Sequence, residues 1–208
     1  MEIRSRFKKF GGTYISDIVE YLREYVEKDP NVTISVGCDS IQRRRKTVYA
    51  VTIMLYNGDI KNGAHVIFFR ENITKVRDNF DRLQKESEYA LQVAEMLNEE
   101  LASFFERRDL VDKERKRYKF HIAKCEGKFD YVSLHNEDSF INNLPLSEAE
   151  RAMPFKLVDI HVDYNPFEGH VDKKGNAKNK SNMSYRAMVP YLRSLGYSVF
   201  EKPLGFAS

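Results

Sequence analysis

The chain has 208 residues, of which 42% are hydrophobic and 31% are charged, so it is long and apolar enough to fold as one large globular domain. Its 34 basic and 31 acidic residues leave a formal net charge of only +3. This near balance excludes a polycation that holds nucleic acid through overall charge alone.

The cysteines and the apolar segments limit the cellular setting. Cys38 and Cys125 lie far apart in the sequence, and no Cys-x-x-Cys pair or His/Cys cluster predicts a zinc site. This usage favours a reducing compartment. The N-terminal segment lacks an apolar signal core, and the longest apolar run is far too short to cross a bilayer. We therefore expect a cytoplasmic protein without a membrane partner.

The first predicted elements are a helix and three strands. Apolar residues at helical spacing predict an amphipathic helix over Thr13 to Lys28. From Asn31 to Asp39, apolar and small polar residues alternate as they do in a strand. Thr47 to Tyr56 and Ala64 to Arg70 predict two more strands, separated by a turn at Asn57-Gly58-Asp59. The short connections predict an antiparallel arrangement of the three strands.

Asp39 is the first candidate site residue, because we expect it where the first strand ends, before a basic turn at Gln42 to Lys46. A carboxylate in that place is exposed enough to bind a metal ion and anchored enough to hold it. The alternative is a turn residue that bonds its own backbone at the Asp39-Ser40 step. This segment alone leaves both interpretations open.

Glu86 is the second candidate, and it lies in the longest helical pattern, Asn79 to Arg107. At about 100° per residue, Glu86 falls within the apolar stripe of this helix, whereas Glu88, Glu95 and Glu99 point away from the stripe. A carboxylate on a buried face is costly unless it is paired, hydrogen-bonded or bound to metal. The alternatives to a functional role are an edge position that reaches solvent or a pair with Arg82.

The segment from Asp109 to Pro154 is expected to be an insertion or an elaborated connection. Tyr118 to Ala123 predicts a short strand, His135 to Asp138 a loop, and Leu144 to Arg151 a short helix. Ser133, His135 and Asp138 are a nucleophile set in composition only, because closeness in sequence does not create the geometry of a triad.

Phe155 to Asp163 again predicts a strand, with Asp159, His161 and Asp163 on one face and apolar residues on the other. Two carboxylates and an imidazole on one strand face are hard to explain as core. The alternative is an edge strand whose polar face lies in water. A basic loop from Phe167 to Lys180, a helix over Ser184 to Leu195 and a last strand over Tyr197 to Lys202 complete the chain.

Basic residues gather in four clusters, although the net charge is small. Taken singly, such clusters are expected to be solvated loops, but several of them on one surface would form a phosphate-binding footprint. They lie at Arg4 to Lys9, Arg43 to Lys46, Lys113 to Lys119 and Lys173 to Lys180.

Five short motifs, in a fixed order, carry a resemblance to a known family. They are Gly37-Cys38-Asp39-Ser40, Arg82-Leu83-Gln84-Lys85-Glu86, His161-Val162-Asp163-Tyr164-Asn165-Pro166, Lys180-Ser181-Asn182, and the closing Lys202-Pro203 with Ala207-Ser208. With the order helix, three strands, long helix, strand, helix and strand, the chain resembles the YkuK-type family of predicted ribonuclease H-like nucleases of bacteria and phages. The likeness covers nearly the whole chain outside about 109–154.

This resemblance implies an α/β protein with the ribonuclease H-like fold. The expected sheet is mixed and five-stranded, with three antiparallel strands, a long helix, a parallel strand, a helix and a final strand. We expect one domain over residues 1–208, with an extra N-terminal helix at 13–28 and the insertion at about 109–154.

The resemblance also implies a nuclease that hydrolyses phosphodiester bonds with two Mg²⁺ or Mn²⁺ ions. Asp39, Glu86 and Asp163 are its expected catalytic metal ligands, Asp159 is a further candidate ligand, and His161 would tune a ligand. The nucleic acid substrate is expected to contact Ser40, Lys178, Lys180, Ser181, Asn182 and Lys202.

One departure from the family pattern leaves other functions open. The pattern continues past Ala-Ser into a helix with a further acid, whereas the printed sequence ends at Ser208. We expect a fourth carboxylate to come from Asp159, Glu201 or a partner subunit. If none supplies it, the chain would be a nucleic-acid-binding or interaction protein that has lost turnover. A structure-selective DNA resolvase, acting as a symmetric homodimer, is the third possibility.

Overall fold

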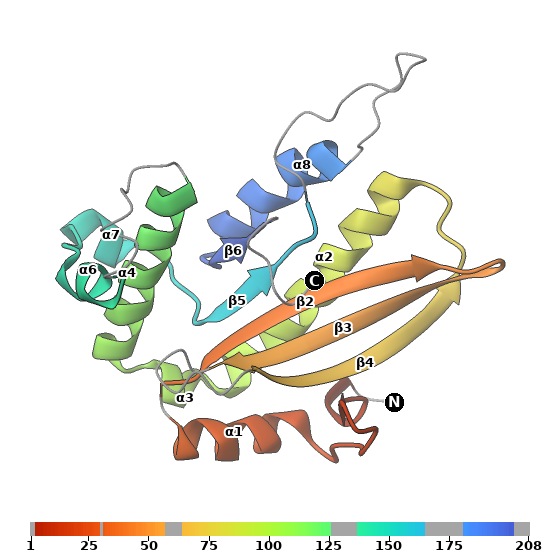
Figure 1. Ribbon diagram of the computed structural model, residues 1–208, viewed down its shortest axis with the longest axis horizontal. Coiled ribbons are helices and arrows are strands. Elements are labelled where there is room, and N and C mark those ends of the chain that lie inside the picture. Colours follow the sequence, from red (N-terminus) through yellow and green to blue (C-terminus); the bar gives the residue numbers. More distant parts are fainter. Residues whose placement is uncertain (1–2, 30, 57–63, 126–136, 165–180, 202–208) are drawn as a thin grey trace.

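A six-stranded mixed sheet forms the centre of the protein (Figure 1). The computed structural model describes residues 3–29, 31–56, 64–125, 137–164 and 181–201. The strand order is β1-β4-β3-β2-β5-β6. In chain order the strands are β1 (Lys8–Lys9), β2 (Thr33–Gln42), β3 (Lys46–Tyr56), β4 (Ala64–Thr74), β5 (Val158–His161) and β6 (Val199–Phe200).

The sheet combines two pairing modes in the way that the sequence predicts. The pairs β1–β4, β4–β3 and β3–β2 are antiparallel. Strand β5 pairs in parallel with β2 on one side and with β6 on the other. Five strands were expected and the structure has a sixth, because Lys8 and Lys9 pair with Phe68 and Ile67 at the edge. Two adjacent lysines have no apolar alternation, so the pattern in the sequence misses this strand.

Three helices lie on one face of the sheet: α1 (Ile18–Lys28), α2 (Asn79–Glu100) and α8 (Ser181–Ser194). Helix α2 packs on β2 and β5, and α8 packs on α2. The core between these layers consists of apolar side chains such as Val36, Val51, Val93 and Leu97, all fully buried.

The ends of two helices differ from the prediction. Helix α1 was expected from Thr13, but it begins at Ile18 because the Asp17 carboxylate accepts a hydrogen bond from Val19 N at 2.8 Å and caps the first turn. Helix α2 was expected to reach Arg107, but it ends at Glu100 and a short helix α3 (Ala102–Phe105) follows. Near the N-terminus, η1 (Ile3–Ser5) is a single 3₁₀ turn.

On the opposite face of the sheet, the described part of the chain covers β5 and β6 with α4 (Arg108–Cys125). The rings of Tyr118 and His121 lie 5.5 Å and 4.3 Å from the Phe200 ring. The predicted strand at Tyr118 to Ala123 is therefore wrong, because this aromatic run belongs to α4 and contacts the sheet at helical spacing. Helices α6 (Glu137–Asn143) and α7 (Glu148–Ala152) flank α4, and α7 overlaps the predicted helix at Leu144 to Arg151 but begins later and ends one residue beyond it. None of the helices in the described ranges combines the length and the apolarity needed to cross a bilayer.

Strand β5 is buried at all four positions, so the alternative of a strand whose polar face lies in water is wrong. Asp159 is 3% exposed, and its Oδ2 accepts a hydrogen bond from Arg117 Nη2 of α4 at 2.6 Å. Burial raises the pKa of Asp159 to about 6, although the Arg117 guanidinium opposes this shift. The pair therefore supplies the charge partner that a buried carboxylate needs.

We expect Arg117→Met to lower the free energy of unfolding by about 3–5 kcal/mol at pH 8, because it leaves Asp159 buried without its cation. The pKa of Asp159 is already above its ordinary value, so the loss should shrink towards pH 5 as the carboxyl takes up a proton. Urea denaturation at both pH values measures this. Arg107→Met, which removes an exposed ion pair with Asp109, is the matched control and should leave stability essentially unchanged at both pH values. Equal losses for Arg117→Met at the two pH values would contradict the assignment.

Candidate active site

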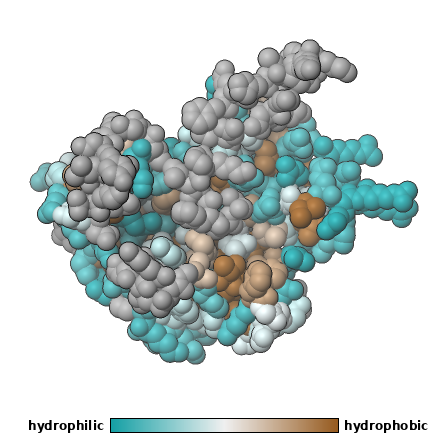
Figure 2. All heavy atoms as spheres, in the orientation of Figure 1, coloured by the Kyte–Doolittle hydropathy of each residue, from teal (hydrophilic) through white to brown (hydrophobic). Residues whose placement is uncertain are grey.

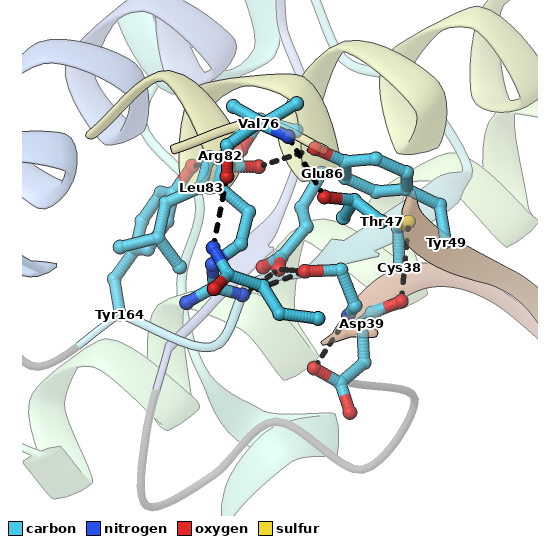
Figure 3. Close-up of polar contacts among 12 residues, drawn as sticks. Cys38, Asp39, Thr47, Tyr49, Val76, Arg82, Leu83, Glu86 and Tyr164 are labelled. Atoms are coloured by element: carbon cyan, nitrogen blue, oxygen red, sulfur yellow. Dashed lines mark hydrogen bonds and ion pairs between the residues drawn. The ribbon is translucent and has the colours of Figure 1, made fainter. Parts of the chain in front are cut away.

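Glu86 is the buried acid of α2, and it lies beside Ser40 and Arg82 (Figure 3). Its side chain sits in the helix stripe that also contains Leu83 and Ala90, and the residue is only 3% exposed. Ser40 Oγ donates a hydrogen bond to Glu86 Oε1 at 2.6 Å, and Arg82 Nη1 donates to the same oxygen at 2.8 Å. Arg82 Nη1 also donates to Ser40 Oγ at 2.6 Å. The three groups form a closed triangle that joins α2 to β2.

The pKa of Glu86 is raised from an ordinary value of 4.5 to about 7. Burial is the main cause, and the negative charges of Asp39 and Asp163 add to it, while the Ser40 hydrogen bond and the Arg82 charge oppose it. Glu86 therefore lies within the electrostatic reach of both other predicted site acids. Its predicted burial is confirmed, and the pair with Arg82, which was the alternative to a functional role, is also present.

Asp39 lies inside β2 and not at the end of the strand, so that part of the prediction is wrong. It pairs with Ala50 of β3, and the strand continues to Gln42. The hairpin closes only where Arg43 N bonds to Lys46 O at 2.7 Å. The Asp39 carboxylate is exposed, accepts a hydrogen bond from Ser40 N at 2.7 Å, and points away from Glu86 in Figure 3.

Asp163 follows β5 at the same level of the sheet as Asp39. The last pair between the parallel strands β2 and β5 is Gly37 opposite His161, and each acid comes two residues later. Both acids therefore lie beyond the last β2–β5 pair, but Asp163 follows the end of β5 and lines a hollow with Glu86, whereas Asp39 lines a hollow on the opposite face of β2. Asp163 is half-buried, with a buried Oδ1.

Tyr164 fixes the segment that carries Asp163 against α2, and the sequence analysis did not identify it. Its hydroxyl donates to Leu83 O at 2.8 Å and shares a 2.5 Å hydrogen bond with Ser87 Oγ. Both Tyr164 and Ser87 are buried. Ser87 next to Glu86 places two polar residues in one apolar stripe, which is the pattern in the sequence that could have indicated a polar contact here.

A narrow hollow, too tight to admit a water molecule, lies between β2, α2 and the segment that follows β5. It is lined by Cys38, Glu86, Ser87, His161, Val162, Asp163 and Tyr164. Burial, together with the charges of Glu86 and Asp39, raises the pKa of the Cys38 thiol, so this lining thiol stays protonated at neutral pH. No three His, Cys, Asp or Glu residues in the described part of the chain are arranged closely enough to hold a metal ion. Glu86 and Asp163 line this hollow and Asp39 does not, so the three acids are not a preformed ligand set.

Two acids that were expected as substitutes for a fourth carboxylate have cation partners elsewhere. Asp159 faces α4 and pairs with Arg117, and Glu201 pairs with Arg193 at 3.3 Å. His161 is buried, its ring stacks on Phe200 with 5.0 Å between centroids, and burial lowers its pKa to about 3. It lines the hollow as a neutral ring.

The predicted substrate residues are only partly described. Lys178, Lys180 and Lys202 lie outside the described residues. Ser181 is the first residue of α8, and Asn182, in the same turn, is 9% exposed. Their contact with substrate stays a prediction.

The basic clusters separate into neutralised and open ones. Arg4 and Arg6 pair with Glu100 and Glu71, and the cluster on α4 contributes Arg117 and Lys119 to ion pairs. The cluster at Arg43 to Lys46 is exposed at the hairpin between β2 and β3. A separate cluster, Lys173 to Lys180, lies outside the described residues.

Comparison with protein families agrees with this geometry. A family model described as Ribonuclease H-like matches residues 14–123, which is more than half of the chain. The chain belongs to the ribonuclease H-like family, and its mixed sheet with a long helix after three antiparallel strands confirms the predicted fold class. Neither the curated proteins nor the solved structures gave a match. Membership of this family indicates a nuclease-type or nucleic-acid-binding function.

The raised pKa of Glu86 predicts a specific pH dependence of stability. The folded state holds the Glu86 proton more tightly than the unfolded state. The stability that this proton contributes is therefore fully present below pH 4.5 and is lost as the pH rises through about 7. Glu86→Gln removes the titrating group and so lacks this pH dependence. Its free energy of unfolding, relative to that of wild type, should therefore rise by about 1–3 kcal/mol over that interval. Denaturant titrations at several pH values measure the difference. Glu88→Gln, exposed on the same helix, is the control, and parallel curves for all three proteins would refute the assignment.

Proposed function

We propose that this protein is a divalent-metal-dependent nuclease that hydrolyses phosphodiester bonds at the site formed by Asp39, Glu86 and Asp163. The observation that carries the proposal is the burial of the Glu86 carboxylate beside Ser40 of β2, with Asp163, just after β5, lining the same hollow. Two acids at one such place, with the charge of Asp39 within electrostatic reach, are unfavourable in a structural core, because like charges repel one another.

The donor set fits a hard divalent cation. All three side chains offer carboxylate oxygens, which Mg²⁺ and Mn²⁺ prefer, and two of the acids already raise the pKa of the third. Glu86 and Asp163 would hold the cation from the side of the hollow, and Asp39 would join only after a local shift of the β2 backbone, because its carboxylate lies on the opposite face of the strand. Bound ions of this kind make water a better nucleophile and stabilise negative charge on the leaving oxygen.

The remaining groups of the site orient the acids. Ser40 and Arg82 fix Oε1 of Glu86, so the second carboxylate oxygen has a defined direction. The Tyr164 hydroxyl holds the peptide after Asp163 on α2 through Leu83 O. Because Ser40 follows Asp39 directly, a backbone hydrogen bond to Asp39 Oδ1 also restrains that carboxylate.

We expect wild-type protein to cleave at least one substrate of a panel in Mn²⁺ or Mg²⁺. The panel contains single-stranded DNA, single-stranded RNA, an RNA/DNA hybrid and branched DNA. Asp39→Asn, Glu86→Gln and Asp163→Asn should each reduce the rate by about a hundredfold or more, because each removes a charged ligand. Asp39→Asn should leave the Tm unchanged or raised, since it relieves repulsion among the acids.

The control for the panel is Glu95→Gln, an exposed acid on α2 that points away from the site and should retain wild-type activity. A second readout does not depend on turnover: Mn²⁺ should raise the Tm of wild type and of Glu95→Gln more than that of Glu86→Gln or Asp163→Asn. Wild-type protein that shows neither cleavage nor a Tm shift with either ion would overturn the proposal.

The second candidate is a nucleic-acid-binding protein without turnover. It is favoured by the direction of the Asp39 side chain, which faces the opposite side of β2 from Glu86. Nucleic acid binding by wild type, combined with the absence of cleavage in the panel, would select this candidate.

A further inference from the structure

Among the described residues, no helix covers the face of the sheet opposite α2 over β2, β3 and β4, and this face contains a hollow of about 360 Å³. That volume lies within the range of pockets that accept small ligands. Figure 2 shows hydrophobic atoms exposed over β2 and β3 and hydrophilic side chains extending beyond the hairpin that joins them. The hollow, which we call the open-face hollow, is lined by Asp39, Ile41, Arg43, Lys46, Val48, Ala50, Arg70 and Asn72.

Three cations surround this hollow and one acid faces them. Arg43, Lys46 and Arg70 are exposed, and none of them makes an ion pair with another described residue. This contrasts with Arg6 one strand away, whose guanidinium pairs with Glu71. An open row of cations of this kind attracts an anionic ligand.

The floor of the hollow between the cations is apolar. Ile41 is 56% exposed, and Val48, its partner across the hairpin, lies beside it at the surface. An exposed branched side chain on a regular strand contributes nothing to the core and presents a flat apolar contact. The hollow therefore fits a ligand that combines an apolar face with negative charge.

Cationic and apolar side chains continue along this face of the sheet towards its edge. Lys8 pairs with Phe68, two residues from Arg70, and its Nζ lies 5.1 Å from the Phe68 ring and 5.9 Å from the ring of Tyr14. Tyr14 is 72% exposed. Lys46 pairs with Thr74, six residues from Phe68, so the row extends for about 20 Å at about 3.3 Å per residue.

We propose that this open face binds a single strand of nucleic acid, with phosphates at Arg43, Lys46 and Arg70 and an unpaired base over Ile41 and Val48. Its lining residues come from β2, β3 and β4, so the hollow extends over about 10 Å across the strands, which is enough for one strand of nucleic acid. Unpaired bases also expose the apolar faces that a duplex buries, and aromatic groups with cations are the usual partners of such strands.

The position of Asp39 links this surface to the proposed function, on which the choice of nucleic acid rests. Asp39 lines the open-face hollow beside Arg70, so a bound strand passes the exposed carboxylate. Without a divalent cation, Asp39 repels the phosphates, and Asp39→Asn should bind a single strand more tightly than wild type. If Asp39 served only to stabilise the fold, Asp39→Asn should instead weaken the binding of the single strand.

The test measures fluorescence anisotropy of a labelled single-stranded oligonucleotide and of the matching duplex, in EDTA and at several salt concentrations. The triple variant Arg43→Gln, Lys46→Gln, Arg70→Gln should bind the single strand about tenfold or more weakly at low salt, and its log–log salt slope should fall by about 2, since each contact contributes about 0.7. Circular dichroism and Tm establish that it folds.

The matched control removes three exposed cations that do not line the hollow: Lys28→Gln, Arg107→Gln, Lys113→Gln. It should keep the wild-type affinity and salt slope. Equal weakening by both triple variants, or equal affinity for strand and duplex, would overturn the proposal. Because EDTA removes turnover from the measurement, loss of binding only in the first triple variant would support this surface even if no substrate were cleaved. If the first triple variant cleaves nucleic acid at the wild-type rate, the result would support the nuclease proposal and overturn the proposed binding surface.

Discussion

The triangle of Glu86, Ser40 and Arg82 is the contact on which the rest of the site depends. It holds an ionisable carboxyl in a place that burial makes unfavourable, and its partners compensate for only part of that penalty. It also sets the position of α2 on β2, since Ser40 belongs to the strand and the other two residues belong to the helix. Catalytic potential and helix docking therefore share one set of hydrogen bonds.

The two faces of the sheet have different tasks, and the difference follows from alternation along β2. Ser40 points into the layer below α2, whereas Asp39 points to the open face. A pair of adjacent polar residues thus serves both sides of one strand. The covered face supplies rigidity and the buried acid, while the open face supplies exposed charge and access.

Periodicity in the sequence predicted the features that depend on local geometry. The burial of Glu86 follows from 3.6 residues per turn, and the mixed sheet follows from the order of the patterns. The end of β2 could not be predicted, because it depends on how far Ser40 to Gln42 pair with β3. The helical state of Tyr118 and the Arg117 partner of Asp159 depend on contacts across 42 residues or more, which no local pattern records. The shared role of the three acids as metal ligands stays a prediction.

The parallel pairing of β2 with β5 has a consequence for how the protein forms. Ile34 pairs with Val158, so the chain must close a loop of more than a hundred residues before β5 can join the sheet. Contacts between such distant residues form slowly, whereas the β2–β3–β4 meander and α2 need only short connections. During synthesis, Asp39 and Glu86 are in place well before Asp163 leaves the ribosome. The segment that carries Asp163 reaches its place only when the Tyr164 hydroxyl bonds to Leu83 O of α2.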